Sequence, residues 1–265
     1  MIKINGIPVE LKTFNDGTYR LQNLSPSAIK DITWCYNNEQ EFMALYYITS
    51  HAKEAGHHPL LNLPYVPNGR MDRTKQINEV FTLKYFCNLI NSLDFKQVNI
   101  FDPHSYVTTA LLNHVNVITP DPQIDDLLDI YDNATLFFPD EGAMKRYYHN
   151  TDVPYAFGVK VRDWETQKIE SLKIAGSKRI IAGHDIIICD DILSRGSTLY
   201  AAARQLKDMG AKNIYVWVSH CENTVLQPHI NGQSLLDIPN LITKVYTTNS
   251  IWSANHNKVE IKLHF

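Results

Sequence analysis

Short apolar runs alternate along the first half of the chain with segments whose apolar residues recur at helical spacing. The strand-like runs are Ile32 to Tyr36, Leu60 to Val66, Val98 to Asp102 and Val115 to Ile118. The expected helices run from a cap at Asn37 or Asn38 to Gly56, from about Ile77 to Asn91, and over a short stretch after His104. Strands that alternate with helices predict parallel sheets covered by helices on both faces.

The second half repeats the alternation. Strand-like runs cover residues 136–138, 155–159, 185–189 and 214–219, and helical segments cover 142–149 and 197–209, the latter ended by Gly210. The pattern predicts two α/β domains, residues 1–125 and 126–265, joined around Pro120 to Asp132. An N-terminal ribbon with an Asn5-Gly6 turn precedes the first domain, and residues 222–265 are interpreted as closing elements with no identifiable chemistry.

Composition narrows the class of protein. The 265 residues are 44% hydrophobic and 20% charged, which is typical of a globular protein and excludes a collagen-like or disordered chain. The net charge of −3 gives no basic field, so neither nucleic acid nor an anionic membrane is an expected partner. The apolar runs fall far short of the roughly 18 residues of a membrane span, and the N-terminus lacks a signal-peptide pattern. We therefore expect a cytoplasmic protein.

The four cysteines support that expectation. They are widely separated, without a Cys-x-x-Cys pair, and two lie in strongly apolar segments. Buried free thiols in a reducing compartment fit this pattern better than disulfides or a metal site.

Most of the chemical information lies in the segment Ile186 to Thr198. An apolar strand ends in Asp190 and Asp191, a short polar loop with Gly196 follows, and a helix then begins. A helix N-terminus beyond the carboxyl end of a strand binds phosphate, and the two carboxylates can take sugar hydroxyls directly or through a divalent cation. In the alternative interpretation the two acids merely end the strand and Ser197 caps the helix. The chain contains neither a Walker A loop nor a Gly-x-Gly-x-x-Gly motif.

Asp-Asp-Ile-Leu-Ser-Arg-Gly-Ser-Thr at 190–198 resembles the phosphoribosyl loop of type I phosphoribosyltransferases and of ribose-phosphate diphosphokinases. The resemblance implies two doubly wound, mostly parallel-sheet α/β domains of phosphoribosyltransferase type. It also implies a set of ribose-5-phosphate-binding residues, namely Asp190, Asp191, Ser194, Arg195, Gly196, Ser197 and Thr198.

Two segments in the first half are similar to the nucleotide-binding parts of the diphosphokinase branch. Phe-Asn-Asp-Gly-Thr at 14–18 resembles an element that holds the adenine of ATP, and residues 63–73 resemble the nucleotide loop. The implied ATP contacts are Phe14, Asp16, Arg70, Asp72 and Arg73. Two guanidinium groups on a loop after a strand suit polyphosphate, although an isolated Arg-x-Asp-Arg is more often a surface ion-pair cluster.

Three further segments, 99–105, 137–146 and 158–166, resemble the catalytic parts of the same branch. They imply His104 and Asp140 beside a bound Mg2+, and Lys160 and Arg162, together with His104, as catalytic residues. Residues two apart on an extended chain project to one side, so Lys160 and Arg162 can reach one anionic centre. Asp140 could instead complement the dipole of the following helix, and the two cations could be exposed on an edge strand.

The resemblance implies transfer of the diphosphoryl group of Mg-ATP to the 1-hydroxyl of ribose 5-phosphate, with ATP and ribose 5-phosphate as partners of at least a dimer. The alternatives are a phosphoribosyltransferase acting on a nucleobase or nicotinamide and a non-catalytic regulatory subunit. Met71, Ser194 and Arg195 depart from the family pattern, in which the corresponding residues are Gln, commonly a third acid, and Thr. The chain is also shorter than usual for the family, which puts its hexamer and allosteric sites in doubt.

Overall fold

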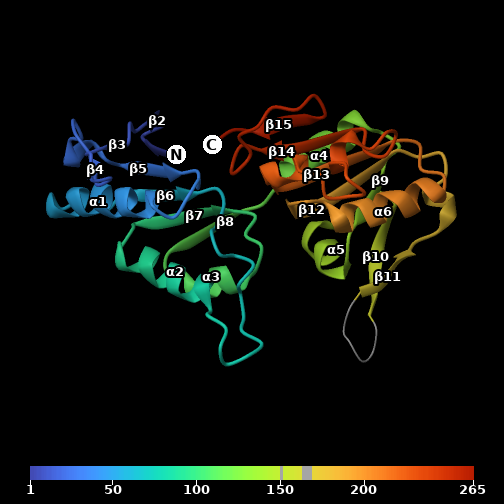
Figure 1. Ribbon diagram of the computed structural model, residues 1–265, viewed down its shortest axis with the longest axis horizontal. Helices are drawn as coiled ribbons and strands as arrows, with labels where there is room; N and C mark the ends of the chain where they lie inside the picture. The colour runs from blue at the N-terminus through green and yellow to red at the C-terminus, as the bar shows by residue number, and fades with distance from the viewer. Residues whose placement is uncertain (150–151, 163–168) are drawn as a thin grey trace. The chain divides into compact units, whose positions relative to one another are not determined.

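The protein divides into two units (Figure 1). Each unit has its own hydrophobic core. The computed structural model describes residues 1–149, 152–162 and 169–265, and the side chains of 160–162 and 169–172 are outside that description. Unit 1 comprises Met1–Thr119 with Phe265, and unit 2 comprises Pro120–His264. The division falls just before a helix, Asp121–Ile130, rather than inside it as residues 125 and 126 would place it. In the described part of the chain, no helix is long and apolar enough to span a bilayer.

Unit 1 is built on a six-stranded sheet in the order β2-β1-β5-β6-β7-β8. Its strands are β1 (Ile2–Ile4), β2 (Ile7–Pro8), β5 (Asp31–Trp34), β6 (Leu60–Leu63), β7 (Gln97–Phe101) and β8 (Val115–Ile118). The last four are parallel, whereas β1 and β2 are antiparallel additions. A separate two-stranded ribbon joins β3 (Lys12–Thr13) and β4 (Tyr19–Arg20), and η1 (Pro26–Ala28) precedes β5.

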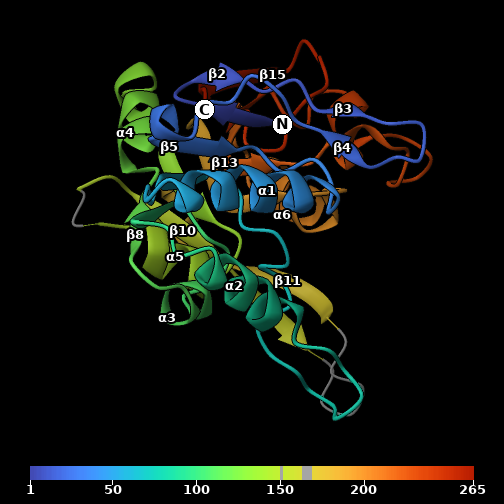
Figure 2. The same cartoon turned by 90° about the vertical axis from the view of Figure 1, so that its left-hand side faces the viewer.

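The helices of unit 1 are α1 (Glu41–Glu54), α2 (Thr82–Ser92) and α3 (Val107–Leu111). Buried residues of α1 and α2 share one core cluster with inward-facing residues of β5 to β7, so both helices cover the same face of the sheet (Figures 1 and 2). The strand order explains this arrangement. Each step from β5 to β8 runs in the same direction, and right-handed crossovers then place the connecting helices on one side.

The opposite face of the same strands carries a ladder of polar side chains. Asn62 donates to Asp31 (2.7 Å), and Asn99 donates to Asn62 (2.7 Å). Asn116 donates to Asn99 at 3.1 Å. Successive residues of a strand point to opposite faces of the sheet. The apolar residues therefore face the helices, and the polar residues between them gather on the other face.

Two helix starts differ in how well the sequence located them. Asn38 accepts a hydrogen bond from the N–H of Glu41 (3.2 Å), but the N-cap residue of α1 is Gln40, whose side chain makes no capping bond. The expectation that a helix begins near Ile77 is wrong, because α2 begins at Thr82. Ile77 is fully exposed and has no core to pack against, and the Glu79 carboxylate accepts the N–H of Lys75 at 2.6 Å to hold a turn instead.

Unit 2 contains a seven-stranded sheet in the order β11-β10-β9-β12-β13-β14-β15. The strands are β9 (Thr135–Phe138), β10 (Tyr155–Arg162), β11 (Ile169–Ala175), β12 (Ile186–Leu193), β13 (Ile214–Cys221), β14 (Lys244–Thr248) and β15 (Val259–Leu263). The helices are α4 (Asp121–Ile130), α5 (Glu141–Tyr147) and α6 (Ser197–Asp208), with short 3-10 turns η2 (Lys178–Ile180), η3 (Asn223–Leu226) and η4 (Leu235–Asp237). All neighbouring strands are parallel except the β10–β11 hairpin.

The strand order of unit 2 reverses direction between β9 and β12. From β9 the chain steps through α5 to β10 on one side, whereas from β12 it steps through α6 to β13 on the other. Right-handed crossovers therefore place α5 and α6 on opposite faces, which makes the carboxyl ends of β9 and β12 a topological switch point. Ligands of open α/β sheets bind at such a switch point, so the fold itself points to the carboxyl ends of β9 and β12.

All four cysteines are free and buried, which confirms the expectation of buried thiols. Burial raises the pKa of each thiol, to about 11 for Cys87. They are consequently poor nucleophiles and metal ligands at neutral pH.

Candidate active site

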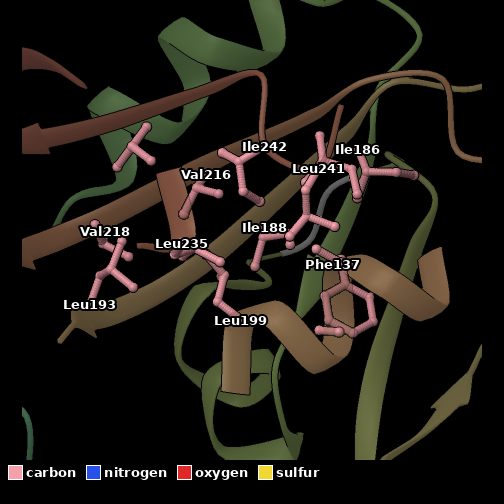
Figure 3. Close-up of a cluster of buried hydrophobic side chains, with 14 of the residues drawn as sticks. Phe137, Ile186, Ile188, Leu193, Leu199, Val216, Val218, Leu235, Leu241 and Ile242 are labelled. Carbon is pink, nitrogen blue, oxygen red and sulfur yellow. The ribbon is translucent and has the colours of Figure 1, made fainter. Parts of the chain in front are cut away.

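The loop between β12 and α6 is fixed at both ends by the core of unit 2. Leu193 precedes the loop and Leu199 follows it, and both are buried. Figure 3 shows them in one cluster with Ile188 of β12 and with Val216 and Val218 of β13. Because both ends are anchored in packed apolar surroundings, the intervening residues 194–198 have a defined place beside the switch point.

The N-terminus of α6 offers its first N–H groups without a side-chain cap. Gly196 is the N-cap residue, with φ at 83°, and it supplies no capping side chain. Ser197 and Thr198, the first two helical residues, are exposed. The structure therefore does not support the interpretation that Ser197 is merely the helix cap. An uncapped helix N-terminus flanked by exposed hydroxyls can bind a phosphate group.

Gly196→Ala should distort this loop. The positive φ disfavours a side chain by about 1–2 kcal/mol, and a Cβ here would lie 2.6 Å from Cδ2 of Leu235. We expect a lower Tm and about tenfold weaker binding of ribose 5-phosphate, measured by calorimetry. Gly183→Ala is the matched control, because its φ is 78° and a Cβ there meets no atom within 4 Å. Equal effects of the two substitutions on binding would contradict a specific role for Gly196.

Three carboxylates gather at the same edge of the sheet. Asp190 and Asp191 belong to the last part of β12, and Asp140 is the N-cap of α5 directly after β9. Burial raises the pKa of Asp190 well above its usual value, and the negative charges of Asp191 and Asp140 raise it further. Such repulsion between carboxylates is relieved by a bound cation or by donated hydroxyl protons, which is the chemistry of a sugar or metal site.

Asp140 also has a structural role at the start of α5, where it is the N-cap residue. Its Oδ1 accepts the N–H of Ala143 at 3.0 Å, as an N-cap does. For Mg2+, which prefers oxygen ligands and is commonly held by one or two carboxylates plus phosphate oxygens, Asp140 and Asp190 have suitable chemistry. The described residues contain no cluster of three or more His, Cys, Asp or Glu that could hold a metal ion. The donor set thus fits a cation bound mainly through substrate oxygens.

Ser194 has a different partner from the one expected for a phosphate-binding hydroxyl. Its Oγ donates to Oε2 of Glu222 at 2.6 Å, and Thr224 donates to the same oxygen at 2.8 Å. Glu222 follows β13 and belongs to the segment in which the sequence revealed no chemistry. Sequence reasoning missed it because its partner lies 28 positions away, and only the pairing of β12 with β13 brings the two together.

In unit 1, the nucleotide-type loop meets the loop that follows β7. The pKa of Asp72 is lowered to about 2, chiefly by a hydrogen bond from Arg73 and also by one from Ser105 and by the charge of His104. Arg73 donates to Asp72 through Nε (2.8 Å) and Nη2 (3.0 Å). A Cβ on Gly69 would lie 3.5 Å from that of His104. The structure therefore brings the carboxyl ends of β6 and β7 together, with the carboxylate of Asp72 held ionised at neutral pH.

Phe14 and Asp16 lie on the separate β3–β4 ribbon. Thr18 donates to Oδ1 of Asp16 through its N–H (3.0 Å) and its hydroxyl (2.7 Å), and these bonds lower the pKa of Asp16. The Arg20 guanidinium lies over the half-exposed Phe14 ring, 5.8 Å from its centroid. The carboxylate thus braces the turn and leaves the aromatic ring accessible at the surface.

Lys160 and Arg162 lie near the end of β10, paired with Leu172 and Ile169 of β11. Their side chains are outside the described part of the structure. The strand expected at 155–159 is present but longer, since β10 continues to Arg162. Its first residues pair with β9, and residues 157–162 form an antiparallel hairpin with β11.

Comparison with known proteins places this geometry in a family. Residues 142–248 match the model described as the phosphoribosyl transferase domain. The ribose-phosphate pyrophosphokinase of Saccharolobus solfataricus is 26% identical over 234 residues, with 82% of this chain and 79% of the relative covered. That of Pyrococcus abyssi is 25% identical, with 82% and 77% covered. Over about four fifths of its length, this chain is therefore similar to ribose-phosphate pyrophosphokinases, which are also called diphosphokinases. The similarity agrees with the resemblance drawn from the loop at 190–198 together with the segments at 14–18, 63–73, 99–105, 137–146 and 158–166.

One solved structure has the same fold. The structure of phosphoribosylpyrophosphate synthetase from Mycobacterium smegmatis superposes with a TM-score of 0.75 and covers 97% of this chain and 86% of its own, at 17% identity. The α/β class with two mostly parallel sheets, expected from the alternation of strands and helices, is confirmed.

Proposed function

We propose that the protein is a ribose-phosphate diphosphokinase that transfers the β,γ-diphosphoryl group of Mg-ATP to the 1-hydroxyl of ribose 5-phosphate. The observation that carries the proposal is the switch point of unit 2, where an uncapped helix N-terminus stands beside Asp190 and Asp191. An anion site adjacent to paired carboxylates suits a phosphorylated sugar, because one end of the ligand is anionic and the other carries hydroxyls.

On the acceptor side, the 5-phosphate is bound by the N–H groups and hydroxyls of the residues from Arg195 to Thr198. Asp190 and Asp191 accept hydrogen bonds from the ribose hydroxyls. Because the raised pKa of Asp190 reflects unfavourable burial and repulsion of its ionised form, hydrogen bonds donated by the sugar hydroxyls would stabilise that form.

On the donor side, the nucleotide is bound across a subunit boundary of at least a dimer, by Phe14, Asp16, Arg70, Asp72 and Arg73, with His104 beside the triphosphate. The Asp72–Arg73 pair supports the loop by holding one guanidinium in a fixed orientation. His104 and Asp140 would hold magnesium, which supplies charge neutralisation for the triphosphate. Support for the proposed ATP-binding residues comes from the contact of residues 69–73 with His104 and Ser105.

In the reaction, the 1-oxygen of ribose 5-phosphate attacks the β-phosphorus. The bond from that phosphorus to the oxygen it shares with the α-phosphorus breaks, AMP leaves with that oxygen, and the hydroxyl proton passes to solvent. Lys160 and Arg162 stabilise the charge that develops between donor and acceptor. The protein otherwise contributes alignment of the attacking and leaving oxygens, which alone can lower a barrier substantially.

The proposal is tested by incubating the protein with Mg-ATP and ribose 5-phosphate and measuring AMP. We expect one AMP for each 5-phosphoribosyl 1-diphosphate formed, with no ADP. Release of diphosphate from 5-phosphoribosyl 1-diphosphate that depends on an added nucleobase or nicotinamide would instead identify a phosphoribosyltransferase, which the matched phosphoribosyl transferase domain at 142–248 also allows. Binding of both ligands without turnover would favour a non-catalytic regulatory subunit.

A further inference from the structure

A cavity of about 280 Å³ lies in unit 1 between the start of α1 and helix α2, beyond the carboxyl end of β5. Trp34, the last residue of β5, lies at its base, and Pro67 and Asn68 of the loop after β6 form one side. The described residues that line it include none of those proposed to bind ATP, ribose 5-phosphate or magnesium. The function proposed above therefore leaves this cavity without a role.

Aromatic rings make up much of the cavity wall. The aromatic lining residues are Trp34, Tyr36, Phe42, Tyr85 and Phe86. Trp34 is 1% exposed, and its ring centroid lies 5.7 Å from that of Tyr36 and 6.3 Å from that of Phe42. Its Nε1 donates to Oε2 of Glu41 at 2.9 Å, which fixes the orientation of the indole. This part of the wall is thus already formed without a ligand.

The outer wall of the cavity presents apolar surface to water. Tyr85 and Leu89 lie one turn apart on α2, and they are 56% and 49% exposed. A ligand seated in the cavity would cover both side chains and remove that apolar surface from water. The body of a matching ligand is therefore apolar.

The charge at the cavity is negative. Glu39 lines it at an exposed position, and the described lining residues include no Lys, Arg or His. The pKa of Tyr36 is raised, chiefly by burial and also by the charges of Glu39 and Glu41. Glu41 is paired with the N-terminal ammonium at 2.6 Å. The faces of aromatic rings are also negative, so both kinds of lining group attract a cation and repel an anion.

We propose that this cavity is a binding site for an organic cation, an ammonium group carried on an apolar body. The cationic group lies against the aromatic rings near Glu39, and the apolar body packs on Tyr85 and Leu89. Attraction of an ammonium group to ring faces is strongest where water is excluded, as it is at the base of a cavity. The inference does not depend on the proposed function, because the site needs neither ATP nor ribose 5-phosphate.

The experiment compares choline with 3,3-dimethylbutan-1-ol, which has the same shape but a carbon atom in place of the charged nitrogen. Both are titrated into the full-length protein, and NMR follows the assigned indole N–H resonance of Trp34. We expect choline to shift this resonance and to bind at least about tenfold more tightly than the alcohol. Equal affinities would contradict a site for cations, and an unmoved Trp34 resonance with both ligands would overturn the site itself.

Glu39→Gln tests the acidic group. Choline should bind about fivefold more weakly to this variant, whereas the affinity for the neutral alcohol should not change. Glu54→Gln is the matched control, because Glu54 is exposed at the other end of α1 and does not line the cavity. Equal choline affinities for Glu39→Gln and Glu54→Gln would overturn the role of Glu39.

Tyr85→Leu tests the aromatic wall with a partly exposed residue, whose replacement keeps an apolar side chain on α2. Choline should lose about fivefold in affinity and the alcohol much less, because only the cation gains from a ring face. Tyr46→Leu is the control, since Tyr46 is 44% exposed on α1 and is not a lining residue. Equal losses for choline and the alcohol in Tyr85→Leu would show apolar packing without recognition of charge.

A titration in the presence of Mg-ATP separates this cavity from the proposed nucleotide site. Pro67 and Asn68 precede Arg70 on the same loop, so the two sites are neighbours in sequence. We expect choline still to bind at saturating Mg-ATP. A choline affinity that keeps falling in proportion to the ATP concentration would show competition for one site and would overturn the inference.

Discussion

Replacing Asp190 with asparagine should remove activity and at the same time make the ligand-free protein more resistant to heat. The pKa of Asp190 is raised in the folded protein by burial and by the charges of Asp191 and Asp140. Its ionised form is therefore destabilising, and a neutral amide of the same shape removes that cost. The lost contact to the sugar hydroxyls should lower kcat/KM for ribose 5-phosphate by about 100-fold or more.

The pH dependence gives a sharper form of this prediction. A carboxyl with a raised folded pKa contributes most stability while protonated and loses that contribution as pH rises from 3.8, its ordinary value, through the folded pKa. The difference in Tm between Asp190→Asn and wild type should therefore be small in acid and grow toward neutral pH. Asp126→Asn, at an exposed position of α4, should change neither the Tm nor the kcat/KM for ribose 5-phosphate. A variant that is active, or less stable than wild type at neutral pH, would contradict the proposed role.

Replacing Lys160 with alanine should lower kcat by about a thousandfold while changing the KM for Mg-ATP only a few-fold. The reason is that its charge is proposed to interact with the transferring group most strongly in the transition state. Steady-state kinetics with both substrates varied measures the two constants separately.

Lys173→Ala provides a matched control for Lys160→Ala. Lys173 is an exposed lysine on β11, paired with Val159 of β10, so it shares the hairpin but not the proposed contact. It should retain wild-type kinetics. Parallel loss of turnover and ATP affinity in Lys160→Ala would indicate that the lysine binds ground-state ATP and would exclude the transition-state role.

The sequence located the most informative local unit correctly. The strand expected at 185–189 forms but continues through Asp190 and Asp191 to Leu193. The polar loop and the helix start at Ser197 follow from a glycine able to adopt positive φ and from helical spacing of apolar residues. Each of these signals is contained within a few residues of chain. This segment suggested two families, phosphoribosyltransferases and diphosphokinases, and the segments at 14–18, 63–73, 99–105, 137–146 and 158–166 favoured the second.

Other features depend on pairing between distant parts of the chain. Strands β14 and β15, the hairpin partner β11 and the polar face of unit 1 have no strong local signature, and their places come from registers with neighbouring strands. The missed start of α2 has a related cause, since the segment before Thr82 has apolar residues but no core to receive them.

By itself, the sequence determined the alternation of strands and helices and the loop after Asp190, and it suggested the family that these features resemble, because periodicity and turn chemistry act over short distances. Only the tertiary structure decided that the strand order reverses between β9 and β12, that Ser105 donates a hydrogen bond to Asp72, and that Ser194 donates one to Glu222. These relations are set by which strands pair and in what register, and that choice minimises the free energy of the whole sheet rather than of any one segment.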